Sequence, residues 1–342
     1  MLTGSVVDLV GIRNYYRWEY QLDRGRPPRR SITKAAVVSA FDTPPQYLDF
    51  PDPLAHGTGE VIVDVLAAGL HPRVRSQANG SHYTSTGELP FVPGVDAVVR
   101  DPNGRIRYAV LDETSLGTMA ERTVIEWDRS VVLPDATDPV LVAAAMNPAM
   151  SSWVALRRRI DFGQGQRVLV VGATGSAGRM AIQVAKRFGA SEVIAAGRNQ
   201  ARLEELAALG AHRTCTFDQL SAAAEADVVI DYVWGEPAVR AMVDMLTARS
   251  DRSRPLTWIQ IGSVAGPDAP IPSAALRSAR LEIVGSGIGS VPGRDFVNEL
   301  PKLAEAVAEG AFDVRARAVP LAEVEQAWTA TAKTSERIVL VP

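Results

Sequence analysis

A length of 342 residues is enough for about two domains, each able to bury its own core. With 46% hydrophobic and 22% charged residues the composition is that of an ordinary globular protein, and a net charge of −3 argues against nucleic acid or an anionic membrane as the main partner. The single cysteine, Cys215, excludes an intrachain disulfide and a thiolate metal cluster, and with four scattered histidines we expect no bound metal.

The first 33 residues differ from the rest of the chain. They carry six arginines against three acidic residues, together with an aromatic cluster at 15–20. We therefore expect an N-terminal extension over 1–33 that docks on a neighbouring surface or remains partly mobile. Asp8 interrupts the early apolar stretch and no small-residue cleavage site follows it, so we expect no signal peptide and a cytoplasmic location.

Short β-prone runs begin after this extension. They are separated by Pro, Gly and Asp turns and cover residues 35–38, 61–65, 97–99 and 123–125. No long helical pattern interrupts them before about residue 139, so this part is predicted to be all-β, most simply a partly open barrel.

An uncharged run at 139–156 is the longest in the chain. It contains two prolines, Asn147 and two serines, so it predicts a pair of buried helices and no membrane span. The arginines at 157–159 are predicted to be a solvated helix end.

Residues 168–178 read VLVVGATGSAG and form the most informative segment. A run of Val and Leu leads directly into Gly172, Gly175 and Gly178, as a buried strand requires when it turns sharply into a helix. Apolar residues at helical spacing follow, and then a second apolar strand at 193–195. This is the order of a βαβ unit, whose helix N-terminus binds a pyrophosphate; the alternative is a glycine-rich turn that binds nothing.

The residues after the second strand bear on the choice of cofactor. A unit that binds NAD usually has an Asp or Glu about twenty residues beyond the glycines, bonded to the ribose 2′-hydroxyl. That position here reads Gly197, Arg198, Asn199, with Arg202 one helical turn later. A guanidinium favours a 2′-phosphate, so the prediction is NADPH, with Asn199 also an N-cap. The alternative is that both arginines are solvated charges at a helix start.

Alternating strand and helix patterns continue to about residue 287. Buried strands at 168–171, 193–196, near Thr214, and at 228–230, 258–261 and 281–284 make six, the number in a full doubly wound dinucleotide domain. Beyond Gly289 the pattern predicts a helix at 295–309, a segment at 321–331, and a terminal strand at 337–341 that returns to the first sheet.

Four residues follow two of the later strands, at the edge where ligands bind in such sheets: Tyr232, Val233, Gly262 and Ser263. Tyr232 is also typical of a packed aromatic residue with a satisfied hydroxyl.

Several stretches, in their order and spacing, resemble the medium-chain dehydrogenase/reductase superfamily and, within it, the zinc-free quinone oxidoreductases. The resemblance covers roughly nine-tenths of the chain, from about Lys34 to Pro342. The stretches are GEVIVDVLAAGLHP (59–72), LPFVPGVDAVV (89–99), GTMAE (117–121), MNPAMSSWVAL (146–156), AIQVAKRFGA (181–190), DVVIDYVWG (227–235), IQIGSVAG (259–266), LEIVGS (281–286) and PLAEVEQAW (320–328).

The resemblance implies an α/β fold. A doubly wound, six-strand parallel nucleotide-binding domain at 149–288 would be inserted in a β-rich, partly open, GroES-like catalytic domain made of 34–148 and 289–342. It also implies a homodimer formed through the strand at 281–284, because relatives often pair there and an apolar edge strand prefers a partner.

The resemblance further implies where the cofactor would bind. The backbone amides of Thr174, Gly175, Ser176, Ala177 and Gly178 would hold the pyrophosphate. Ser151 or Ser152 would lie near the nicotinamide, although both are equally typical of helix-cap serines.

The chain departs from its zinc-dependent relatives at their metal ligands. They have a cysteine in the segment that here reads GLHP (69–72), and a histidine and a glutamate where this chain has Gly94-Val95-Asp96. The cysteine-rich lobe of their structural zinc is missing as well. His71 alone cannot assemble a three-ligand zinc site, so metal-assisted alcohol oxidation is not expected.

The resemblance and the residues together predict an NADPH-dependent, zinc-independent reductase of quinones or α,β-unsaturated carbonyl compounds. Ser76 stands where such relatives have a tyrosine, and His71, His82 and Tyr83 are candidate donors to the developing oxyanion, although each type is often structural. One alternative is an enoyl-thioester reductase. Another is a catalytically impaired NADPH-binding sensor, scaffold or nucleic-acid-binding protein.

Overall fold

The computed structural model describes residues 32–111, 115–287, 289–330 and 336–342. Residues from Ile32 to Pro342 form one compact unit. The predicted N-terminal extension lies outside the described residues except for its last two positions.

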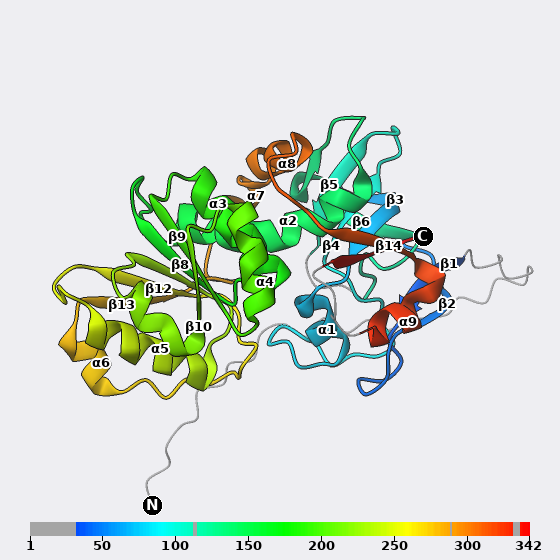
Figure 1. Cartoon of the computed structure of the whole chain (residues 1–342). Helices are drawn as coiled ribbons and strands as arrows, with labels where there is room; N and C mark the ends of the chain where they lie inside the picture. Colours follow the sequence, from blue (N-terminus) through cyan, green and yellow to red (C-terminus); the bar gives the residue numbers. More distant parts are fainter. Residues whose placement is uncertain (1–31, 112–114, 288, 331–335) are drawn as a thin grey trace, which may run out of the picture. The chain divides into compact units, whose positions relative to one another are not determined.

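Six strands form one sheet in the spatial order β10-β9-β8-β11-β12-β13 (Figure 1, green to gold). All of its neighbouring pairs are parallel. This is the doubly wound 3-2-1-4-5-6 order of dinucleotide-binding domains, so the predicted parallel sheet is confirmed. The strands are β8 Arg167–Val171, β9 Glu192–Gly197, β10 Arg213–Thr216, β11 Val228–Asp231, β12 Leu256–Gln260 and β13 Leu281–Gly285.

Both faces of this sheet are buried by helices. Within β8, Val168 and Val170 pack in one hydrophobic cluster with residues of α2 (Pro139–Val154) and α3 (Ser176–Arg187). Leu169 and Val171 pack in another cluster, with residues of α5 (Gly235–Ala248). Because successive side chains of a strand point to opposite faces, an unbroken apolar run suits a strand covered on both sides.

Seven further strands form a mixed sheet in the order β14-β15-β3-β4-β5-β7, with β6 paired to β3. The last strand, β15, lies between β14 and β3, so the terminal strand predicted at 337–341 does return to the first sheet. A separate pair consists of β1 Ile32–Val37 and β2 Gln46–Pro51. The seven strands are β3 Glu60–Gly69, β4 Asp96–Arg100, β5 Ile106–Val110, β6 Arg122–Glu126, β7 Ser130–Val132, β14 Ala316–Pro320 and β15 Arg337–Val341.

The remaining helices are short. The α-helices are α1 Pro72–Ala78, α4 Gln200–Glu204, α6 Ser273–Ser278, α7 Gly293–Val297, α8 Leu300–Ala308 and α9 Val324–Thr329. The 3₁₀ turns are η1 Trp127–Arg129, η3 Glu205–Leu209, η4 Phe217–Ala223 and η5 Leu321–Glu323. The single helix predicted at 295–309 is therefore wrong, because α7 and α8 divide this segment.

The predicted pair of buried helices at 139–156 is also wrong. The segment forms one helix, α2, which contains Pro148 and continues as a π-helix, η2 Ala155–Arg159. By length and composition alone the span Pro139–Arg159 could cross a membrane, but 72% of its most apolar window is buried inside the protein. That degree of burial is typical of the core helix of a globular protein.

The arginines at 157–159 are not simply solvated. Arg157 and Arg158 form ion pairs with the Glu299 carboxylate, with N–O distances of 3.0 and 2.6 Å, and the Trp153 indole donates to the same carboxylate at 2.8 Å. Arg159 donates to the carbonyl of Gly285 at 2.7 Å. These bonds connect the π-helix to Glu299, the N-cap of α8, and to the end of β13.

Candidate functional site

The glycine turn after β8 has a backbone that only glycine adopts easily. Gly172 has φ +87°, and its N–H bonds the carbonyl of Ala196 on the neighbouring strand. A Cβ at this position would lie 3.1 Å from a methyl carbon of Val233 and 3.3 Å from Cβ of Tyr232. The turn thus packs directly against the residues that follow β11.

Gly178 and Gly175 serve different purposes. A Cβ at Gly178 would lie 2.4 Å from the carbonyl oxygen of Gly172, so this glycine lets α3 pack closely on the turn. Gly175 is exposed and is the N-cap of α3, where it provides no side-chain cap. Ser176 and Ala177 follow in a first turn that contains no acidic residue. The N-terminus of this 12-residue helix is therefore suited to an anion such as a pyrophosphate.

The end of β9 is joined to the glycine turn. A Cβ at Gly197 would lie 3.0 Å from the methyl group of Thr174. Asn199 is the N-cap of α4, accepting from the Arg202 N–H at 3.1 Å, as predicted. Arg198 is exposed and Arg202 is half-buried, and no acidic residue stands between Gly197 and Arg202. This edge offers guanidinium groups, not a carboxylate, to a ribose 2′-substituent.

The structure brings Ser151 and Tyr232 together, with 2.9 Å between their hydroxyl oxygens. Ser151 is half-buried and also donates to the carbonyl of Pro148 at 2.8 Å. Burial raises the pKa of Tyr232 to about 12, so its phenol is neutral and bonded. Ser152 is fully buried and donates to the carbonyl of Ala149, so only Ser151 of the pair reaches the edge of the core.

Asp231, the last residue of β11, shapes this edge of the sheet and was not among the residues predicted from the sequence. Its buried carboxylate accepts from the backbone N–H groups of Val233 at 2.7 Å and Trp234 at 3.0 Å. A third bond comes from the Trp258 indole at 2.9 Å. Burial raises the pKa of Asp231, although these donors oppose the rise. An acidic residue at the end of an apolar strand is the feature of the sequence that could have pointed to Asp231.

The Asp231 bonds hold the next residues in an uncommon conformation. Trp234 has φ +52°, the only positive φ of a non-glycine residue in the described part of the chain, and Gly235 follows with φ +67°. A Cβ at Gly262 would lie 2.6 Å from the Tyr232 carbonyl. The segments that contain Tyr232 and Gly262, with Ser263 next to it, therefore lie side by side.

His71, one of the candidate donors, is buried in a polar network. Its Nε2 lies 2.8 Å from Oδ1 of Asp96, and the Tyr108 hydroxyl donates to the other carboxylate oxygen at 2.9 Å. Burial lowers the pKa of His71, although Asp96 opposes the shift, so the neutral ring is favoured. Its Nδ1 has no hydrogen-bond partner among the described residues. The side chain is 2% exposed, which leaves it out of reach of a substrate.

The donor set at this position does not suit zinc. His71 and Asp96 come from the two segments in which zinc-dependent relatives have their ligands, and here they bond each other. Among the described residues, no three His, Cys, Asp or Glu side chains lie close enough to share a metal ion.

The other predicted donors lie on α1 and the loop after it. The Ser76 hydroxyl donates a hydrogen bond to the carbonyl of Arg73 at 2.9 Å. The His82 ring stacks on Tyr83 with 4.4 Å between centroids, and its Nδ1 lies 2.6 Å from the Thr84 hydroxyl. Burial and the charge of Arg73 lower the pKa of His82.

Tyr83 is the most accessible of the candidate donors. Its side chain is 72% exposed, and a Cβ at Gly287 would lie 3.6 Å from its hydroxyl oxygen. Gly287 follows β13 at the carboxyl edge of the parallel sheet, so Tyr83 is close to the edge at which ligands of such sheets bind.

The chain is similar to known oxidoreductases in sequence. Residues 177–309 match the family model described as "Zinc-binding dehydrogenase". A protein of Emericella nidulans named "Probable NADPH-dependent quinone reductase tdiC" is 30% identical over 90% of this chain and 99% of its own length. An Arabidopsis thaliana protein named "NADPH-dependent alkenal/one oxidoreductase, chloroplastic" is 30% identical over 44% of this chain and 43% of its own.

The fold has solved counterparts. The quinone oxidoreductase of Thermus thermophilus, described with its NADPH complex, matches with a TM-score of 0.77 and 25% identity over 90% of this chain and 100% of that one. Three observations indicate the same family: the order of the parallel strands, the glycine turn, and the near full-length similarity to the Emericella protein. The chain belongs to the medium-chain dehydrogenase/reductase superfamily, in its quinone oxidoreductase-like branch.

Proposed function

We propose that this protein is an NADPH-dependent reductase that transfers a hydride to a quinone or an α,β-unsaturated carbonyl compound. The observation that carries the proposal is the uncapped N-terminus of α3 next to a β9 edge that offers Arg198 and Arg202 and no carboxylate. The names of the Emericella and Arabidopsis relatives indicate the same cofactor and the same classes of acceptor.

The residues of this site would bind and orient the cofactor. The amides of the α3 N-terminus would hold the pyrophosphate, and the two guanidiniums would bind the 2′-phosphate. Ser151 and Tyr232 would lie at the nicotinamide end, with Tyr232 positioned by the loop that Asp231 pins. When bound, NADPH supplies the hydride, and the protein contributes positioning and exclusion of water.

A proton donor is needed once negative charge develops on the carbonyl oxygen of the acceptor. Of the four candidates, His71 is buried against Asp96 and Ser76 is bonded within its own helix. His82 and Tyr83 form a stacked pair on one loop. We assign the donor role to Tyr83, with His82 positioning its ring. Solvent can replace it, so Tyr83→Phe is expected to reduce turnover without abolishing it.

Three further properties belong to this proposal. The enzyme works without zinc, since its histidine and aspartate at the metal position bond each other. It acts in the cytoplasm.

It forms a homodimer through β13, the outermost strand of the parallel sheet, whose Leu281, Ile283 and Val284 are only half-buried. Sedimentation equilibrium tests the dimer, and a charge at Ile283 is expected to shift it to monomer.

The decisive experiment is steady-state oxidation of NADPH by the purified protein with a panel of quinones and enones, followed by the loss of NADPH absorbance. We expect turnover with NADPH and much weaker turnover with NADH. Tight NADPH binding with no turnover on any acceptor would contradict the reductase activity. It would favour the alternative of a catalytically impaired protein that binds NADPH as a sensor. Turnover only on enoyl thioesters would favour the thioester reductase.

A further inference from the structure

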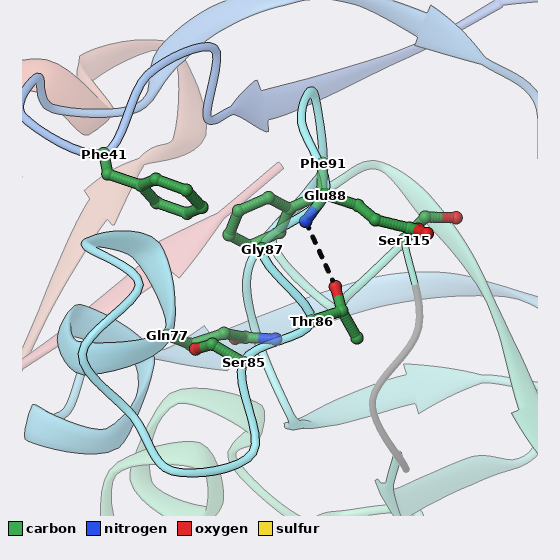
Figure 2. A pocket seen from close by; sticks show the side chains of 8 residues that line it. All are labelled: Phe41, Gln77, Ser85, Thr86, Gly87, Glu88, Phe91 and Ser115. Carbon is green, nitrogen blue, oxygen red and sulfur yellow. Dashed lines mark hydrogen bonds between the residues drawn. The ribbon is translucent and has the colours of Figure 1, made fainter. Parts of the chain in front are cut away.

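A pocket of about 170 Å³ is lined by none of the residues assigned to the cofactor. It is formed by α1, the loop that follows it, and two residues from elsewhere, Phe41 and Ser115 (Figure 2). None of its lining residues belongs to the parallel sheet. Nothing in the proposed reaction uses this pocket.

Two phenylalanine rings form its apolar side (Figure 2). Phe91 is 9% exposed and packs in a cluster with Val38 and Ala78. The ring of Phe41 packs against Gly80, since a Cβ there would lie 3.1 Å from a ring carbon, and the φ of +72° favours glycine at this position. Both rings are thus held in place by their surroundings, and their positions do not depend on a ligand.

The polar side of the pocket contains hydrogen-bond donors without acceptors. Gln77 is 7% exposed, and its side-chain oxygen accepts from the Gly94 N–H at 3.1 Å. This bond fixes the amide orientation and leaves the NH₂ group, at the far end of the side chain in Figure 2, with no partner among the described residues. The buried hydroxyl of Ser85 also has no hydrogen-bond partner among the described residues. An acceptor from a ligand would satisfy both.

The size of the pocket and the charge of its lining residues further restrict the class of ligand that it can bind. An engineered apolar cavity of about 150 Å³ binds benzene, so this volume holds one six-membered ring with a small substituent. The lining residues include the carboxylate of Glu88 and no lysine or arginine, which disfavours an anion.

We propose that this pocket binds a neutral, planar, single-ring carbonyl compound. The ring lies against Phe41 and Phe91, and the carbonyl oxygen accepts hydrogen bonds from Gln77 and Ser85. The proposal concerns binding alone. A failed reductase assay therefore leaves it standing, and its own failure leaves the reductase standing.

The test compares two probes, acetophenone and ethylbenzene, which share the ring and differ in the carbonyl oxygen. Affinities are measured on the full-length protein by ligand-observed NMR. Acetophenone is expected to bind roughly 3- to 10-fold more tightly, the value of one or two neutral hydrogen bonds. Benzoate, which has the same ring and a negative charge, is expected to bind more weakly than acetophenone.

Ser85→Ala is the informative variant, because the hydroxyl has no partner among the described residues and its loss should leave the fold intact. It is expected to reduce the preference for acetophenone at least 3-fold and to leave ethylbenzene binding unchanged. Ser81→Ala, an exposed serine on the same loop, is the matched control. Gln77→Met is a second variant with the same expected direction.

Two results would overturn the proposal. The first is equal affinity of the wild-type protein for both probes, or no saturable binding of either. The second is a preference for acetophenone that survives in Ser85→Ala and in folded Gln77→Met. If Gln77→Met does not fold, the Ser85 variant alone decides.

Discussion

At the scale of single residues, the candidate site depends on glycines placed where a side chain would collide with the backbone. The Cβ of any other residue at Gly178 would overlap the Gly172 carbonyl. The spacing of these glycines predicted the turn, because a strand that bends into a helix needs them. Asp231 could not be predicted in the same way, since its role depends on Trp258, a residue 27 positions further along the chain.

Gly178→Ala tests the close packing of α3. We expect the free energy of unfolding to fall by about 1–3 kcal/mol, because the methyl group forces the helix away from the turn. Urea unfolding measures the change. Gly163→Ala is the control, since its Cβ would meet only a glutamine side-chain oxygen at 4.0 Å. Equal stability of the two variants would contradict the prediction.

The double substitution Arg198→Ala with Arg202→Ala tests the choice of cofactor. We expect KM for NADPH to rise roughly 5- to 50-fold, because charge-assisted bonds to the 2′-phosphate are lost at a partly exposed edge. KM for NADH should change little. Arg187→Ala, an exposed arginine on α3, serves as the control. Equal loss of affinity for the two nucleotides would argue against 2′-phosphate recognition.

At the scale of elements, the strands were easier to predict than the helix contacts. Apolar runs predicted the inner strands β8, β9, β11 and β12, which are largely buried, whereas β10 and β13 at the two edges of the parallel sheet contain exposed residues. The end of α2 was not predictable from local sequence. Arg157 and Arg158 have the pattern of a solvated helix end, but Glu299, more than 140 residues later, pairs with both of them.

Glu299→Ala tests what this pairing contributes. Burial alone would raise the pKa of Glu299, but the Trp153 indole and the two guanidiniums outweigh it and lower the pKa. Removing the carboxylate leaves these donors unpaired. The expected loss is about 1–3 kcal/mol in the free energy of unfolding, reduced because both arginines are about a third exposed.

The control for this variant is Glu305→Ala, an exposed glutamate on α8, the helix whose N-cap is Glu299. Urea unfolding of both variants gives the comparison. A stability cost in Glu305→Ala as large as that in Glu299→Ala would show that α8 itself, and not the ion pairs, is sensitive to the change.

At the scale of the whole molecule, buried acidic side chains that include Cys215, Tyr232 and Tyr108 make stability depend on alkaline pH. Burial raises the pKa of Cys215 from 9.0 to about 11 and that of Tyr232 from 10.0 to about 12. Above about pH 9 the unfolded chain loses protons that the folded chain keeps. These two groups therefore add no pH dependence well below pH 9, and they lower the free energy of unfolding as the pH rises toward 11 and 12.

Cys215→Ser isolates the contribution of the Cys215 thiol. The hydroxyl does not ionise in this range, so the loss of stability between pH 9 and about 11 should be smaller by about 1–3 kcal/mol. Denaturant unfolding over this pH range provides the measurement. The same slope in the wild-type protein and the variant would contradict the shift assigned to Cys215.

Strand β15 has a consequence for the order in which this protein is made. It pairs with β3, yet all six strands of the parallel sheet lie between the two in the chain. As the polypeptide leaves the ribosome, the parallel sheet can close while the end of β3, at Ala68 and Gly69, still has an unpaired edge. A translating cell must therefore shield that edge for most of the time the chain takes to emerge.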